Sequence, residues 1–182
     1  MPSDAKILIV ADHEDTLYAL ESALSPLTHE VICATSGDAA LKEVLRGNIG
    51  LLLLDVRVPD VGGLEVVRYM RRVEQTQYIP IVLVTGFGPD AALSSAALRL
   101  GVADLIPKPV DPWALRTKVS YLFRTHQRLR AMEGELRELR TRPPSRTLSG
   151  RGRAVGRTRG VDPRSPVPLE LPLQPDSAPQ GG

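Results

Sequence analysis

The sequence lacks the features that hold secreted or membrane-spanning proteins together. It has one cysteine among 182 residues, so it cannot form an internal disulfide. No apolar run approaches the ~20 residues of a transmembrane helix, and the N-terminal run, Ile7–Val10, is too short for a signal peptide. Cys33 lies in another short apolar run, which predicts a small core residue. These absences favour a soluble protein in a reducing compartment, and we expect it to be cytoplasmic.

Aromatic residues are also scarce, and they are confined to one part of the chain. They make up 4% of the residues, and none follows Phe123. Residues 141–182 contain 8 prolines and 6 glycines and carry 7 arginines against 3 acids. Such a segment cannot bury enough apolar surface to offset the entropy lost on ordering, so we predict a disordered basic tail over 141–182. Its arginines alone would support nucleic-acid binding; a solvated tail without a specific partner is the simpler interpretation.

The stretch Ile49–Asp55 is the strongest structural signal in the chain. Its first six residues are almost wholly apolar and a carboxylate follows at once, which predicts a strand buried on both faces of a sheet. Similar runs predict strands at 6–10, 30–34, 78–85 and 103–106. Amphipathic stretches between and after these runs predict helices at 16–25, 37–46, 64–72 and 90–100 and from 112 onwards. This alternation predicts a doubly wound α/β fold with a five-stranded parallel sheet, flavodoxin-like (βα)5, in a domain over 1–125.

The last predicted helix continues beyond the sheet. Leucines recur every seven residues at Leu115, Leu122, Leu129 and Leu136, and Met132 and Leu139 add a second series. The early members should face the sheet, whereas the later ones could face a partner helix. We therefore predict a helical extension over 126–140, which is either a short coiled coil that makes a homodimer through 112–140 or a solvated extension.

Four polar residues stand at or just after the ends of four predicted strands: Asp12, Asp55, Thr85 and Lys108. In a doubly wound sheet these strand ends meet at one edge. Two neighbouring carboxylates repel unless a cation neutralises them, and Mg²⁺ suits a site with few protein ligands and several waters. Lys108 adds a compact positive charge and Thr85 a hydroxyl donor. Each residue alone has a structural explanation, but the set suits an aspartate that attacks phosphorus.

The motifs that carry these residues resemble a known family. The order of these motifs along the chain resembles that of the receiver domains of two-component response regulators, and the resemblance covers about residues 5–125. The matching stretches are Ile7–Val10 with Asp12, Leu54-Asp55 with Pro59 and Gly63, Pro80–Gly86, and Lys108-Pro109.

The resemblance implies that Asp55 accepts a phosphoryl group from a phosphohistidine on a histidine kinase or a phosphotransfer protein. It implies that Asp12, Asp55 and the backbone carbonyl of Arg57 hold Mg²⁺. Thr85 and Lys108 would contact the phosphoryl oxygens. The expected function is that of a single-domain response regulator in a phosphorelay, a signalling switch rather than an enzyme. Its output would be protein–protein contact through the fourth helix, fifth strand and fifth helix.

The sequence departs from the family pattern at Ala11 and Leu105, and Arg57 and Phe87 flank the site where the family varies the lifetime of the phosphoryl group. The family usually has two adjacent acids after the first strand, and the first of them is Ala11 here, which predicts weaker Mg²⁺ binding and slower phosphorylation. The usual aromatic residue of the fifth strand is Leu105, so a switch that moves a ring there cannot operate in the same way. Two alternatives remain open: a receiver-like scaffold that is not phosphorylated, and an N-terminal fragment of a larger hybrid kinase or regulator.

Overall fold

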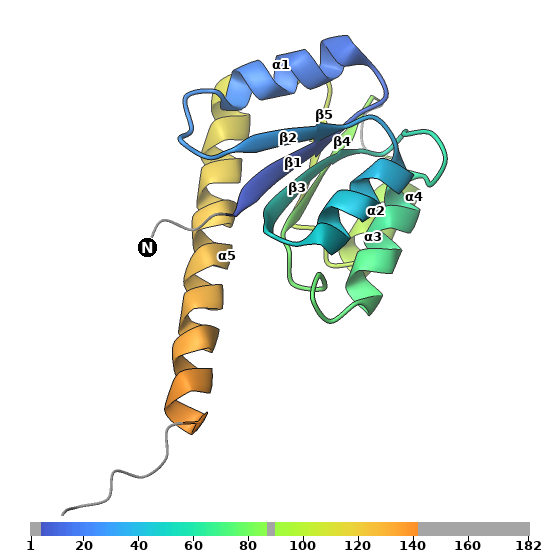
Figure 1. Ribbon diagram of the computed structural model, residues 1–182. Coiled ribbons are helices and arrows are strands. Elements are labelled where there is room, and N and C mark those ends of the chain that lie inside the picture. Colours follow the sequence, from blue (N-terminus) through green and yellow to red (C-terminus); the bar gives the residue numbers. More distant parts are fainter. Residues whose placement is uncertain (1–4, 87–89, 142–182) are drawn as a thin grey trace, which may run out of the picture. The chain divides into compact units, whose positions relative to one another are not determined.

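The computed structural model describes residues 5–86 and 90–141, and it confirms the predicted α/β fold (Figure 1). The strands are β1 (Lys6–Val10), β2 (Val31–Ala34), β3 (Ile49–Asp55), β4 (Ile81–Thr85) and β5 (Asp104–Pro107). The helices are α1 (Glu14–Leu24), α2 (Gly37–Arg46), α3 (Gly63–Arg72), α4 (Ala91–Arg99) and α5 (Pro112–Thr141). All neighbouring strands pair in parallel, in the order β2-β1-β3-β4-β5. The predicted tail over 141–182, from Arg142 onwards, lies outside the described residues.

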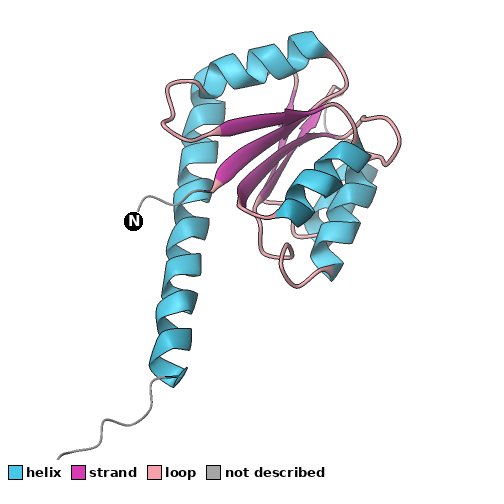
Figure 2. Ribbon diagram, viewed as in Figure 1, coloured by secondary structure: helices cyan, strands magenta, loops and turns pink. Residues whose placement is uncertain are grey.

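The sheet is covered on both faces (Figure 2). Helices α1 and α5 pack on one face and α2, α3 and α4 on the other, so the domain has two apolar cores. Strand β3 serves both cores: Leu51 and Leu53 belong to the α1–α5 core, whereas Leu52 and Leu54 belong to the other. All seven residues of β3 are buried. The unbroken apolar run therefore predicted the central strand correctly.

Helix α2 has a capping residue at each end. Ser36 caps α2 by accepting a hydrogen bond from the Ala39 N–H at 3.2 Å, and Gly47 ends that helix with φ 92°.

The prediction that Cys33 is a small core residue is wrong, because the residue is exposed. It lies on β2, which is an edge strand of the sheet. Partial burial and then the Glu21 carboxylate raise the pKa of its thiol.

Arg71 fastens the edge of the sheet opposite to the predicted site. Its guanidinium donates hydrogen bonds of 2.9–3.1 Å to four backbone carbonyls, those of Gln77, Ile79, Leu100 and Gly101. These carbonyls lie just before β4 and at the turn before β5. Arg71 therefore fixes the entry of both strands whose far ends carry Thr85 and Lys108.

Helix α5 crosses the sheet directly over Gly50 in β3. A Cβ atom at Gly50 would lie 2.6 Å from both the Phe123 ring and the Gln127 side-chain nitrogen. His126, also buried, faces the Gly50 backbone, and burial followed by the nearby Arg130 charge lowers the pKa of its ring. Only glycine allows the helix to approach the strand so closely. Within the described residues, no helix combines the length and the apolar character needed to cross a bilayer.

We predict that Gly50→Ala lowers the free energy of unfolding by about 1–3 kcal/mol, because the added methyl group displaces α5 from a filled core. Urea denaturation followed by circular dichroism measures this change. The matched control is Gly134→Ala, where no atom lies within 4 Å of the added carbon and where alanine favours the helix. Equal stability of wild type and Gly50→Ala would show that α5 does not depend on this close contact.

Candidate site at the carboxyl edge of the sheet

The pairing of the strands brings the predicted site residues to one edge. Val10 pairs with Leu54, so Ala11 lies next to Asp55 and Asp12 lies one step beyond. On the other side of β3, Asp55 pairs with Val84 of β4. One position further along, Thr85 of β4 pairs with Pro107 of β5, which Lys108 follows directly. The four residues therefore come from neighbouring strand ends, as predicted, although Asp12 lies two residues past the end of β1 rather than at it.

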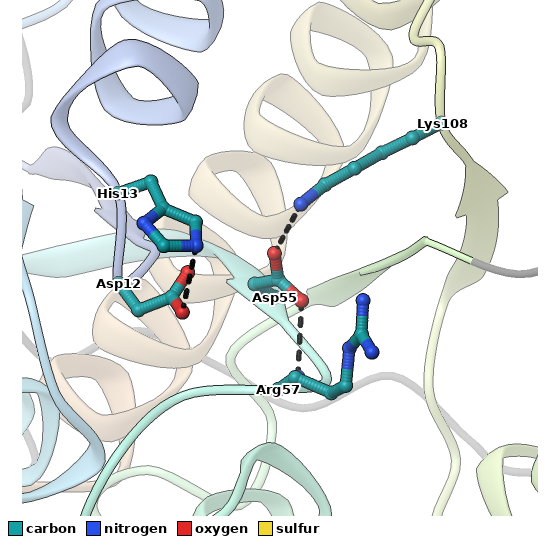
Figure 3. A network of polar contacts seen from close by, with 5 residues as sticks. All are labelled: Asp12, His13, Asp55, Arg57 and Lys108. Carbon is teal, nitrogen blue, oxygen red and sulfur yellow. Dashed lines mark hydrogen bonds and ion pairs between the residues drawn. The ribbon is translucent and has the colours of Figure 1, made fainter.

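Asp55 is the most enclosed charged group of this edge. Only 3% of the residue is exposed. Its Oδ2 accepts a hydrogen bond from the Lys108 ammonium group, and its Oδ1 accepts one from the Arg57 N–H at 3.0 Å (Figure 3). The backbone N–H of Lys108 donates a hydrogen bond to the Thr85 carbonyl at 2.8 Å, which fixes the Lys108 backbone against the end of β4. A charge that is both buried and paired in this way keeps a fixed position.

Glycines allow the loop after β3 to fold back over the strand end. A Cβ atom at Gly63 would lie 2.7 Å from the Asp55 carbonyl oxygen, and the Gly63 N–H donates to the Val56 carbonyl at 3.1 Å. On the α2 side, a Cβ atom at Gly37 would lie 1.8 Å from the Val61 carbonyl oxygen. Substitution of either glycine would push the loop away from the site.

Asp12 lies on the same edge, with about a third of its side chain exposed, and its carboxylate pairs with the His13 Nε2 at 3.3 Å (Figure 3). The donor set predicted for Mg²⁺ is the carboxylates of Asp12 and Asp55 with the Arg57 carbonyl. These are hard oxygen atoms from few protein ligands, and they fit an ion that keeps several waters. Residues 5–86 and 90–141 contain no cluster of three or more His, Cys, Asp or Glu side chains that could hold a metal. Ala11, fully buried in the α1–α5 core, adds no ligand.

Thr85 and Arg57 border a hollow of about 370 Å³ between the end of β4 and the start of α4. Thr85 is 6% exposed. The Arg57 guanidinium lies against Gly86, where a Cβ atom would be 2.9 Å from its Nη2. Sequence reasoning did not predict that Arg57 reaches across to β4 or that His13 pairs with Asp12. The glycine at position 86 was the one signal for the first of these contacts. Phe87, which follows, lies outside the described residues.

We predict that Lys108→Ala lowers the free energy of unfolding by about 1–3 kcal/mol. This loss is smaller than the loss on breaking a fully buried ion pair, because the Lys108 side chain is partly exposed. The substitution leaves the Asp55 carboxylate enclosed without its counter-charge. Adding Asp55→Asn to this variant should restore most of the loss, since an amide carries no charge. The control is Lys118→Ala, whose pair with Asp104 is more exposed and contributes about 0–1 kcal/mol. Equal losses in the two lysine variants would contradict the prediction.

Comparisons with known proteins agree with this architecture. The response regulator RpfG of Xanthomonas campestris, a cyclic di-GMP phosphodiesterase, is 37% identical over 123 residues, which cover 66% of this chain and 32% of that protein. The response regulator TodT of Pseudomonas putida is 35% identical over 103 residues, covering 57% and 44%. A CheY-like receiver domain structure from Methanospirillum hungatei has 25% identity and a TM-score of 0.62, and the match covers 68% of this chain and 97% of that one.

The match thus spans less than half the length of these two curated relatives. The family model of the response regulator receiver domain matches residues 7–120, which is well over half of the chain. The chain therefore belongs to the response regulator receiver domain family of two-component signalling.

Proposed function

We propose that this protein is a phosphorylation switch whose Asp55 accepts a phosphoryl group from a phosphohistidine. The observation that carries the proposal is the Asp55 carboxylate, almost fully buried and held between the Lys108 ammonium group and the Arg57 N–H. A carboxylate in this position is oriented before a donor arrives, so little reorganisation precedes its attack. The donor would be a histidine kinase or a phosphotransfer protein.

The transfer exchanges one bond to phosphorus for another. An Asp55 carboxylate oxygen forms the new bond to phosphorus, while the bond from phosphorus to the donor histidine nitrogen breaks and the nitrogen keeps the electron pair. Lys108 balances the negative charge of the transferring group, and the Thr85 hydroxyl donates a hydrogen bond to one of its oxygens. Mg²⁺ held by Asp12, Asp55 and the Arg57 carbonyl would supply further positive charge at the phosphoryl oxygens.

The output is proposed to be protein–protein contact in the cytoplasm, through the surface formed by α4, β5 and α5. Lys108 and Thr85 lie at the ends of β5 and β4, so a change in their positions on phosphorylation would reach this surface first. Leu105 in β5 is partly buried against the core of α2, α3 and α4, which means that the element moved there is not an aromatic ring.

A second candidate function is a receiver-like scaffold that is not phosphorylated. One observation favours it: Ala11 is fully buried in the apolar core at the place where the family usually has a further acid. A site with one carboxylate fewer attracts a divalent cation less strongly. The two candidates differ in whether Asp55 becomes modified.

We predict that incubation with acetyl phosphate and Mg²⁺ adds one phosphoryl group to the wild type and none to Asp55→Asn, because the amide is not a nucleophile. Intact-protein mass spectrometry measures the gain. The matched control is Asp60→Asn, which makes the same change at an exposed position in the adjacent loop and should keep the gain. An unmodified wild type with an intact fold would favour the scaffold.

We also predict that Ala11→Asp lowers the Mg²⁺ concentration needed for half-maximal phosphorylation and raises the rate, because the new carboxylate joins Asp12 at the ion. Titration of Mg²⁺ against the rate of phosphorylation measures both. Ala11→Asn has nearly the same size without the charge and should give a smaller gain. Since Ala11 is buried, circular dichroism must show both variants folded. An unchanged Mg²⁺ requirement in folded Ala11→Asp would contradict this account of the departure.

A further inference from the structure

The C-terminal end of α5 carries an apolar stripe that nothing in the described part of the chain covers. Every residue from Arg128 to Thr141 is exposed, and this orange end of the helix runs past the sheet (Figure 1). Its four large apolar side chains expose 53–65% of their surface; they are Leu129, Met132, Leu136 and Leu139. Their spacing of three, four and three residues is that of the a and d positions of two successive heptads.

The stripe continues from the part of α5 that packs on the sheet. Leu115 is fully buried, and Leu122, one heptad before Leu129, is partly buried against the α1–α5 core. The leucines of this heptad series before Leu129 are therefore used within the domain, whereas Trp113 and Tyr121, which do not belong to the series, are exposed. If the helix forms the coiled coil rather than a solvated extension, this series offers a partner only its later residues, from Leu129 to Leu139.

Charges beside the stripe indicate what covers it. Leu129 and Leu136 occupy a positions, and Met132 and Leu139 occupy d positions. The g positions are then Arg128 and Glu135, and the e positions are Glu133 and Arg140. In a parallel two-stranded coiled coil each g residue faces the e residue five positions further along the other helix. Arg128 would then face Glu133 of a second copy, and Glu135 would face Arg140. Both pairs are of opposite charge, and none of the four residues forms a salt bridge within the described residues.

The antiparallel arrangement gives the opposite result. In an antiparallel pair, e residues face e residues and g residues face g residues. When the two apolar stripes overlap completely, Glu133 faces Glu133 of the second copy and Glu135 faces Glu135, and both pairs have like charges. Gly134, which weakens the helix, occupies an f position on the outer side in either arrangement. The apolar spacing thus fits a second helix, and the charges choose its direction.

We propose that a second copy of this chain covers the stripe as a parallel two-stranded coiled coil over residues 129–139. Two heptads form a small interface, so the dimer is weak and depends on protein concentration. The already docked N-terminal half of α5 supplies the helix nucleus that so short a coiled coil could not supply alone. This inference does not depend on whether Asp55 is phosphorylated, and it places the two domains side by side with their α5 helices pointing the same way.

Sedimentation equilibrium of the full chain tests the proposal. The wild type should dimerise at tens to hundreds of micromolar. Arg128→Glu and Glu133→Arg should each weaken association by about tenfold, because each makes both symmetry-related pairs repulsive. The combined variant should regain wild-type association, since the charges are then exchanged. Glu138→Arg makes the same charge change at an outward c position and should have no effect.

Cysteine cross-linking tests the direction of the helices. In a Cys33→Ser background, Leu129→Cys alone should give a covalent dimer on mild oxidation, because in the parallel arrangement each a residue faces its own copy. In the antiparallel arrangement position 129 faces position 139, and cross-linking would need a mixture of the Leu129→Cys and Leu139→Cys variants. A wild type that is monomeric at several hundred micromolar, a double charge variant that stays weakened, or cross-linking only in the mixture would each overturn the proposal.

Discussion

The carboxyl edge of the sheet depends on one buried negative charge and the groups that hold it. Asp55 lies at the end of a strand with core on both faces, where an unpaired carboxylate would be very costly. Lys108 and the Arg57 N–H supply the compensating contacts. Because Lys108 follows β5, this pairing links strands that are not neighbours, β3 and β5, across the end of β4. The proposed phosphorylation of Asp55 would therefore change a contact on which this edge of the sheet already depends.

Close backbone approaches keep that edge in shape. Gly63 and Gly37 let the loop after β3 lie against the strand end and against α2, and Gly50 lets α5 lie directly on β3. On the opposite edge, the Arg71 guanidinium holds the entries of β4 and β5 through backbone carbonyls. The site residues thus stand on strands fixed at both ends. Such a framework can convert a small change at one carboxylate into a defined movement of a surface.

The sequence predicted the parts of this structure that follow from local pattern. The apolar run before Asp55 identified the central strand, and the order of polar residues at strand ends identified the edge where they meet. Cys33 was misjudged, because an apolar run does not reveal that its strand lies at the edge of the sheet. The reach of Arg57 to Gly86 and the four contacts of Arg71 were not predicted, because a long flexible side chain can find partners anywhere within several ångströms. The roles of Asp12, Thr85 and Lys108 in phosphoryl transfer stay predictions.

The central claim is that Asp12, Asp55 and the Arg57 carbonyl form one cation site, with Lys108 at its border. The most direct test is a crystal structure of the full chain after the crystals are soaked in Mn²⁺. This ion binds the same oxygen-rich sites as Mg²⁺ and scatters X-rays anomalously, so its position can be identified. The account predicts one strong anomalous peak within bonding distance of both carboxylates and the carbonyl, with the Lys108 ammonium group still beside Asp55. Density without a peak at this edge, or a peak bound by neither Asp12 nor Asp55, would contradict it.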